Sequence, residues 1–147
     1  MAKIEIKSYR KEREREITDG LEKSMWKAGA TVERQAKLNI LQHAAKTPWK
    51  STSQVASAVV HQVSISGNKI VTEIGIGQGE DAKGTTLAKI GKYLELGHKQ
   101  QPGRYVAAIG KRLVKSHVPA YPWLFPAAES KRNEIKEILK GREFTID

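Results

Sequence analysis

Cysteine is absent from the 147 residues of this sequence. Its absence excludes disulfide bonds, thiolate zinc sites and cysteine nucleophiles. The fold must therefore be stabilised by side-chain packing, to which contacts with partner subunits can add.

Long apolar runs are also absent. No segment approaches the roughly 18 consecutive apolar residues that a membrane-spanning helix requires. The first residues, Met-Ala-Lys-Ile-Glu-Ile-Lys, lack the apolar core of a secretory signal. We therefore expect a protein that is made and kept in a cytosol-like compartment and has no membrane partner.

Groupings of residues that support catalysis are scarce. The four histidines, at positions 43, 61, 98 and 117, do not have metal-ligand spacing. The Gly75-Ile-Gly-Gln-Gly79 segment lacks the remainder of a phosphate-binding motif, so it favours a flexible strand exit. His61 falls among apolar residues of the same strand parity, which favours a strand histidine over a catalytic base. We expect no enzymatic activity, no cofactor and no metal.

Positive charge is present in excess and is unevenly placed. The formal net charge is +10, and the segment from Lys83 to His117 contains eight Lys or Arg residues but a single acid, Glu95. Such a segment predicts a surface that meets phosphate or an acidic protein ring, and the alternative is a solvated loop without a specific partner. The candidate interaction residues are Lys99, Arg104, Lys111, Arg112 and Lys115.

One long helix dominates the first third of the chain. Apolar residues recur every three or four positions from Ile17 to about Ala45, which predicts an amphipathic helix. Thr18 and Asp19 are candidate caps if the helix begins near Leu21, and Gly29 inside it marks either a close packing contact or simple tolerance. Residues 9–16 alternate in charge without an apolar face, so we expect residues 1–16 to form a flexible arm or a frayed helix start.

The middle of the chain predicts a β-hairpin. Pro48 ends the long helix and begins a loop to residue 53. Apolar residues then alternate over 54–66 and 69–76 around a Gly-Asn turn at 67–68. Residues 87–96 fit either a short helix or a strand that ends at Gly97.

The last third contains the most distinctive pattern. Pro119, Pro122 and Pro126 exclude an ordinary helix through residues 120–121 and predict an extended aromatic connector. Pro122 or Pro126 would stand in the first turn of a closing helix, with Trp123, Leu124 and Phe125 anchoring it to the core. The position of Glu95, between Leu94 and Leu96, suits a carboxylate that pairs with an Arg or a backbone amine.

The closing helix is expected to end near residues 140–141. This leaves a single domain with a folded core of 17–141 and a loose tail of 142–147.

A Tyr-x-Glu-x-Gly element followed by Pro-Ala-x-Pro-aromatic-Leu-x-Pro-Ala and a helix resembles the small head-tail joining or tail-completion proteins of tailed bacteriophages. The corresponding residues run in the same order, through 32–39, 48–53, 55–76, 93–97 and 119–128. The signature residues are Tyr93, Glu95, Gly97, Pro119, Pro122, Trp123, Leu124 and Pro126.

The resemblance implies an α+β fold in which a long N-terminal helix and a C-terminal helix pack on a curved antiparallel sheet with a long basic loop. It implies a structural virion protein that assembles as a homo-oligomeric ring, a hexamer in this family, at the neck or upper tail. Its partners would be the adjacent connector and the tail-tube or tail-terminator proteins, with nonspecific contact to DNA in the channel. The protein would lie at the head-tail interface of the virion, and in the host cytoplasm during assembly.

Two other functions stay open at this point. A sequence-tolerant nucleic-acid-binding protein would also need the basic segment, although no helix-turn-helix, zinc-finger, RNP or KH signature is present. A small hydrolase or nuclease would need an activity that depends on Glu95 or one of the histidines.

Overall fold

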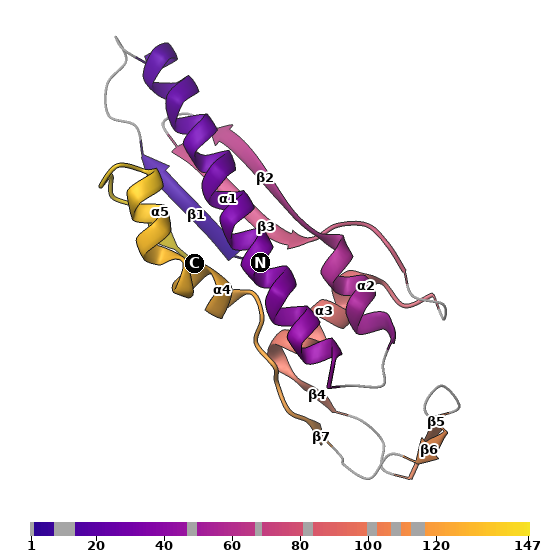
Figure 1. The fold of residues 1–147 in the computed structure, drawn as a ribbon. Helices are drawn as coiled ribbons and strands as arrows, with labels where there is room; N and C mark the ends of the chain where they lie inside the picture. The colour runs from indigo at the N-terminus through magenta and orange to yellow at the C-terminus, as the bar shows by residue number, and fades with distance from the viewer. Residues whose placement is uncertain are drawn as a thin grey trace. The chain divides into compact units, whose positions relative to one another are not determined.

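The computed structural model describes residues 2–7, 14–46, 50–66, 69–80, 84–99, 103–106, 110–112 and 117–147. Helices and an antiparallel sheet occur together, so the α+β class is confirmed (Figure 1). The sheet has the strand order β2-β3-β1-β8. Its strands are β1 (Ala2–Lys7), β2 (Val59–Ser66), β3 (Lys69–Ile76) and β8 (Thr145–Ile146).

Five helices and four very short strands complete the described part of the chain. The helices are α1 (Glu14–Ala44), α2 (Lys50–Ala58), α3 (Leu87–Leu96), α4 (Phe125–Ser130) and α5 (Arg132–Ile138). The short strands form two pairs, β4 (His98–Lys99) with β7 (His117–Val118) and β5 (Tyr105–Val106) with β6 (Lys111–Arg112).

The chain divides into two compact units whose segments alternate along the sequence. We call residues 1–36, 59–75 and 124–147 the sheet unit, and residues 37–58 and 76–123 the arm unit. Helix α1 contributes its first part to the sheet unit and its last turns to the arm unit. Sequence patterns alone predicted one domain and did not indicate this division.

The core of the sheet unit is built from alternating strand residues and a helical stripe. In α1, the predicted three-or-four spacing is confirmed by burial, with Leu21, Met25, Ala28 and Val32 at most 4% exposed. The strands and the closing helices supply the remaining buried side chains, among them Ile4, Ile6, Ile70, Ile74, Ala127, Ala128, Ile135 and Leu139.

Of the two alternatives expected for residues 1–16, the flexible arm is wrong at residues 2–7, whereas a helix start agrees with residues 14–16. Ala2–Lys7 is strand β1, which pairs antiparallel with β3 from Ala2 opposite Ile74 to Lys7 opposite Lys69. Helix α1 already begins at Glu14, so Thr18 and Asp19 lie inside it and do not cap it. The alternation of apolar and charged residues over Ala2–Lys7 is itself typical of a half-buried strand, and the prediction grouped these residues with the charged segment that follows.

The loose tail expected over 142–147 is also wrong at its end. Strand β8 pairs with β1, and Lys3 and Asp147 exchange two backbone hydrogen bonds of 3.0 and 3.1 Å. The backbone groups of the C-terminus are thus satisfied by the first strand, a long-range pairing that local sequence does not encode.

Helix α2 replaces the loop and early strand that were expected over 50–58. Its buried residues Thr52, Val55 and Ala56 follow helical spacing, whereas Val55 and Val59 also satisfy strand spacing. Both periods fit such a short segment, so tertiary burial selects the helix. The predicted strands are confirmed from Val59 to Ser66 and from Lys69 to Ile76, and the 67–68 turn lies outside the described residues.

Of the two alternatives for residues 87–96, the helix is confirmed as α3. The Thr86 hydroxyl accepts a hydrogen bond from Lys89 N–H at 3.4 Å and caps the first turn. The closing helix is divided at Lys131 into α4 and α5, and it ends at Ile138, near the predicted position.

Candidate interaction surface

The two motifs of the last third meet within the arm unit. The backbone N–H of Trp123 donates to Glu95 Oε2 at 2.7 Å, and the N–H of Tyr121 donates to the Leu94 carbonyl at 2.6 Å. The indole N–H of Trp123 donates to the Gly91 carbonyl at 2.9 Å. We call these contacts between residues 91–97 and 118–123 the clasp. Of the two partners proposed for Glu95, an Arg or a backbone amine, the structure shows the backbone N–H of Trp123.

Gly97 permits the close approach on which the clasp depends. Its φ of +74° lies in the left-handed region, and its N–H donates to the Tyr93 carbonyl at 2.8 Å. A Cβ atom at this position would lie 2.6 Å from the Val118 carbonyl oxygen. Both the backbone conformation and the space therefore require glycine.

The last turns of α1 hold the clasp from a second side. Asn39 Nδ2 donates to the Trp123 carbonyl at 3.1 Å, and the ring of His43 stacks on that of Tyr121 with centroids 4.0 Å apart. Burial, and secondarily the charge of Lys46, lowers the pKa of His43, which favours the neutral ring in this stack.

The proline segment joins the clasp to α4. Pro126 stands in the first turn of α4, where a missing N–H leaves no helix hydrogen bond unmade, whereas Pro119 and Pro122 are exposed and precede the helix. Trp123 and Leu124 are buried, at 3% and 6% exposure. Phe125, expected to anchor the turn with them, is instead 51% exposed, because the helix that begins at Phe125 turns Ala127 and Ala128 toward the core.

Tyr93 lies on the outer side of α3. Its ring stacks on His98 with centroids 4.7 Å apart, and Lys89 Nζ lies 5.7 Å from the ring centroid. This arrangement combines an aromatic stack with a cation-π contact at the surface.

Four of the five candidate basic residues are exposed in the described part of the chain: Lys99, Arg104, Lys111 and Arg112. Lys115 lies outside the described residues. Strands β5 and β6 place Tyr105 opposite Arg112, and Arg112 Nη1 donates to the Gly103 carbonyl at 2.9 Å. We call residues 99–115 the basic arm. That hydrogen bond links strand β6 of the basic arm to Gly103, which lies just before β5.

The division into units reveals a charge separation that sequence order hides. The arm unit contains 11 Lys or Arg and three Asp or Glu residues, a net charge of +8. The sheet unit contains 15 and 13, a net charge of +2. Residues 37–58 contain three lysines and no acid, and they belong to the same unit as the basic segment. Their contribution to the net charge of the arm unit could not be counted from the sequence, because the unit boundaries come from the structure.

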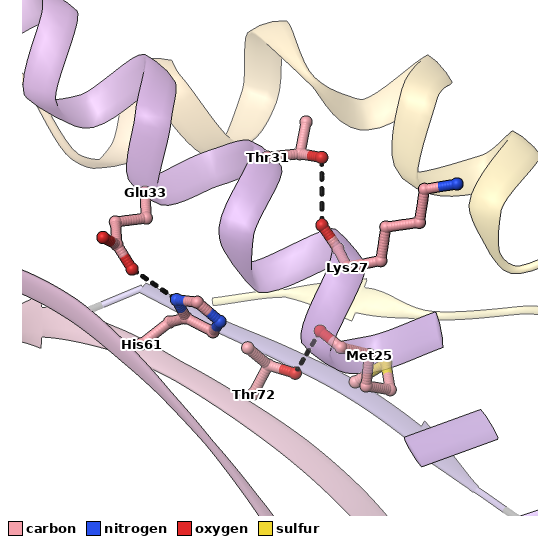
Figure 2. A network of polar contacts seen from close by, with 6 residues as sticks. All are labelled: Met25, Lys27, Thr31, Glu33, His61 and Thr72. Atoms are coloured by element: carbon pink, nitrogen blue, oxygen red, sulfur yellow. Dashed lines mark hydrogen bonds and ion pairs between the residues drawn. The ribbon is translucent and has the colours of Figure 1, made fainter. Parts of the chain in front are cut away.

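A polar cluster in the sheet unit connects α1 to the strands beneath it (Figure 2). Glu33 Oε2 contacts His61 Nδ1, and the ring of Trp26 meets that of His61 edge-on at 5.2 Å. Thr72, fully buried, donates from its hydroxyl to the Met25 carbonyl at 3.2 Å (Figure 2). Sequence spacing did not reveal the carboxylate beside His61, because 28 residues separate the two.

A hollow of about 820 Å³ in the sheet unit is lined by charges of both signs. Arg132, on its wall, is already paired with Glu129 at 2.8 Å, which lowers the pKa of that carboxyl. Glu5 is likewise paired with Lys69 at 3.1 Å. Lys136 and Arg142 are then matched by Glu143 and Asp147, so the hollow offers no excess of one charge to a ligand.

Within the described residues, no cluster of three His, Asp or Glu side chains is arranged to hold a metal ion. None of the described helices combines the length and apolar character needed to cross a membrane. Comparisons with known protein families, with curated proteins and with solved structures find no match to this chain.

Proposed function

We propose that this protein is a structural component of a tailed-bacteriophage particle, which assembles as a ring at the neck or upper tail and joins head to tail. The clasp is the observation that carries this proposal. Three of the eight signature residues lie in the clasp: Trp123 N–H donates to Glu95, and Gly97 permits the close approach of Val118. A chance likeness between two separate short motifs would not require them to meet.

The separation of charge supports an adaptor. A nearly neutral sheet unit suits contacts between copies, whereas a unit of net charge +8 suits a different, acidic partner. We also propose the finer arrangement that the resemblance implies. In it, the long N-terminal helix and the C-terminal helix pack on a curved antiparallel sheet that carries a long basic loop.

Strand β2 offers a place where neighbouring copies would meet. Among the described strands it is hydrogen-bonded only to β3, and its eight residues contain no Lys, Arg, Asp, Glu or Pro. Exposed strand edges are normally protected by charge, proline or shortness, as β8 is by its two residues. Because copies of a chain with net charge +10 repel one another, an interface between them should exclude cations, and β2 meets that condition.

The test is to locate the tagged protein in particles made by the phage or prophage that encodes it. We expect label at the head-tail junction, and we expect K111E/R112E/K115E to reduce the yield of joined particles while the subunit remains folded. The matched control K136E/K140E/R142E makes the same charge change at exposed positions of the sheet unit.

Two results would contradict the proposal at different levels. Absence of the protein from every particle would reject the joining function itself and favour the sequence-tolerant nucleic-acid-binding alternative. Label at the junction with normal assembly by the triple variant would retain the function and reject the role of the basic arm in it.

A further inference from the structure

We infer that the arm unit contains a binding site for the phosphate backbone of double-stranded DNA, formed by the outer face of α3 together with the basic arm. The inference deepens the proposed joining function, because it names what the basic face contacts. It can be tested on the isolated protein, so its failure and the failure of the joining function are distinguishable.

Helix α3 presents a positive face without a competing acid. Lys89, Lys92, Tyr93 and Leu96 are exposed, at the spacing of one helical face. The single carboxylate of this helix, Glu95, is part-buried and accepts the hydrogen bond from Trp123 N–H. The clasp therefore engages and partly buries the one carboxylate of α3, which weakens its repulsion of phosphate.

The arm continues this positive character beyond α3. Lys99 follows the helix directly in β4, and Arg104, Lys111 and Arg112 are exposed around the β5–β6 pair. The bond from Arg112 to the Gly103 carbonyl and the β5–β6 ladder keep part of the arm in a defined shape. Six exposed cations thus lie in the described part of residues 84–123, against Glu95 alone.

The type of cation favours a nucleic acid over an acidic protein. Four of the six residues are lysines, which protein-protein interfaces tend to exclude, whereas lysine serves well as a point charge on phosphate. Large exposed apolar side chains near them are few, as Leu96 and Tyr105 are the main examples. An acidic ring would normally meet a more apolar interface centre.

The aromatic residues favour backbone contact with a duplex over base stacking. Tyr93 is already stacked on His98 and approached by Lys89, so its faces are occupied. The buried Trp123 donates its indole N–H to the Gly91 carbonyl, so it is not available to a base. Among the described aromatic side chains of residues 84–123, Tyr105 is the most exposed, at 58%, and it supplies at most one stacking platform beside six exposed cations. Contact with phosphates is therefore the main source of affinity, and binding should be insensitive to sequence.

The experiment measures affinity for a labelled duplex of arbitrary sequence by fluorescence anisotropy, with NaCl varied from about 50 to 200 mM. If all six cations contact phosphate, the slope of log K against log[NaCl] should be about −5, and affinity should fall about 10³-fold over this range. Removing three contacts in K92Q/K99Q/R104Q should reduce the slope to roughly half of that value.

Two variants control for charge and folding. K23Q/K27Q/R34Q makes the same change at exposed positions of α1 in the sheet unit, and its slope should match that of the unchanged protein. K92R/K99R/R104K keeps the charge at the tested positions and should retain the slope, even if the glutamine variant proves less stable. Urea unfolding of each variant reports whether it is folded.

Four outcomes would overturn the inference. The first two are an unchanged slope in K92Q/K99Q/R104Q and an equal loss in K23Q/K27Q/R34Q. The third is binding to labelled polyglutamate as tight as to the duplex, which would assign these cations to an acidic protein. The fourth is tighter binding to single-stranded DNA than to the duplex, which would reject backbone contact as the main source of affinity.

Discussion

At the scale of single residues, two glycines of α1 show how different surroundings give the same residue different roles. A Cβ atom at Gly29 would lie 2.7 Å from both His61 Cδ2 and Thr72 Cγ2, whereas one at Gly20 would meet nothing within 4 Å. The close packing contact that the sequence left open for Gly29 is therefore present, and at this point α1 packs closely against side chains of β2 and β3.

We predict opposite effects of alanine at these two positions. Gly29→Ala should lower the free energy of unfolding by about 1–3 kcal/mol, because the added methyl group displaces buried neighbours. Gly20→Ala should raise it by about 0.5–1 kcal/mol, because alanine loses less backbone entropy in a helix. Urea unfolding measures both, and a stabilised Gly29→Ala variant would show that the contact has room to relax.

Glu95 allows a second prediction about a single side chain. Glu95→Ala removes the acceptor of the Trp123 N–H and should cost about 1–3 kcal/mol of unfolding free energy. Glu95→Gln keeps an oxygen acceptor without the charge and should cost less. Urea unfolding of each variant measures the change in the free energy of unfolding.

The control for this prediction is Glu137→Ala on the exposed side of α5, which should change stability by no more than about 0.5 kcal/mol. Equal stability of the Glu95 and Glu137 variants would mean that the clasp does not depend on the carboxylate.

At the scale of elements, the edge strand β2 carries a prediction about assembly. Gln62 and Ser64 are exposed on β2, so Q62K/S64K should leave the subunit folded while placing charge on the edge. We expect this variant to lose self-association in analytical ultracentrifugation and to lose incorporation into particles. Unchanged assembly would exclude β2 as the contact between copies.

A matched variant separates the edge from the added charge. Q42K/Q54K also adds two lysines at exposed positions, but on α1 and α2. Association lost equally in both variants would indicate general repulsion between cationic subunits and not an effect at the strand edge.

Elements also differ in how well local pattern predicts them. Helix α1 has many repeats of its apolar period, so its existence follows from sequence. Helix α2 is short and its pattern fits more than one period, so its state depends on which face the rest of the chain buries. The alternation of β1 fits a strand, but no local window contains its pairing with β3 and β8.

At the scale of the whole molecule, the excess of positive charge has a different meaning once the two units are known. Sequence order places most of the net positive charge between residues 83 and 117, and the structure adds the lysines of 37–58 to the same unit. The resulting contrast between +8 and +2 gives the protein one charged and one nearly neutral unit. Long-range attraction of an anionic partner would therefore act mainly on the arm unit.

The sequence by itself determined the features that depend on local chemistry. The periodicity of α1, the extended prolines before α4, the alternation of β2 and β3, and the charge of the basic segment all follow from neighbouring residues. Only the tertiary structure decided that Glu95 accepts a hydrogen bond from Trp123 N–H, that His61 contacts Glu33, and that β1 pairs with β8. These pairings join residues far apart in the chain, and they form because folding buries polar groups that must then find partners.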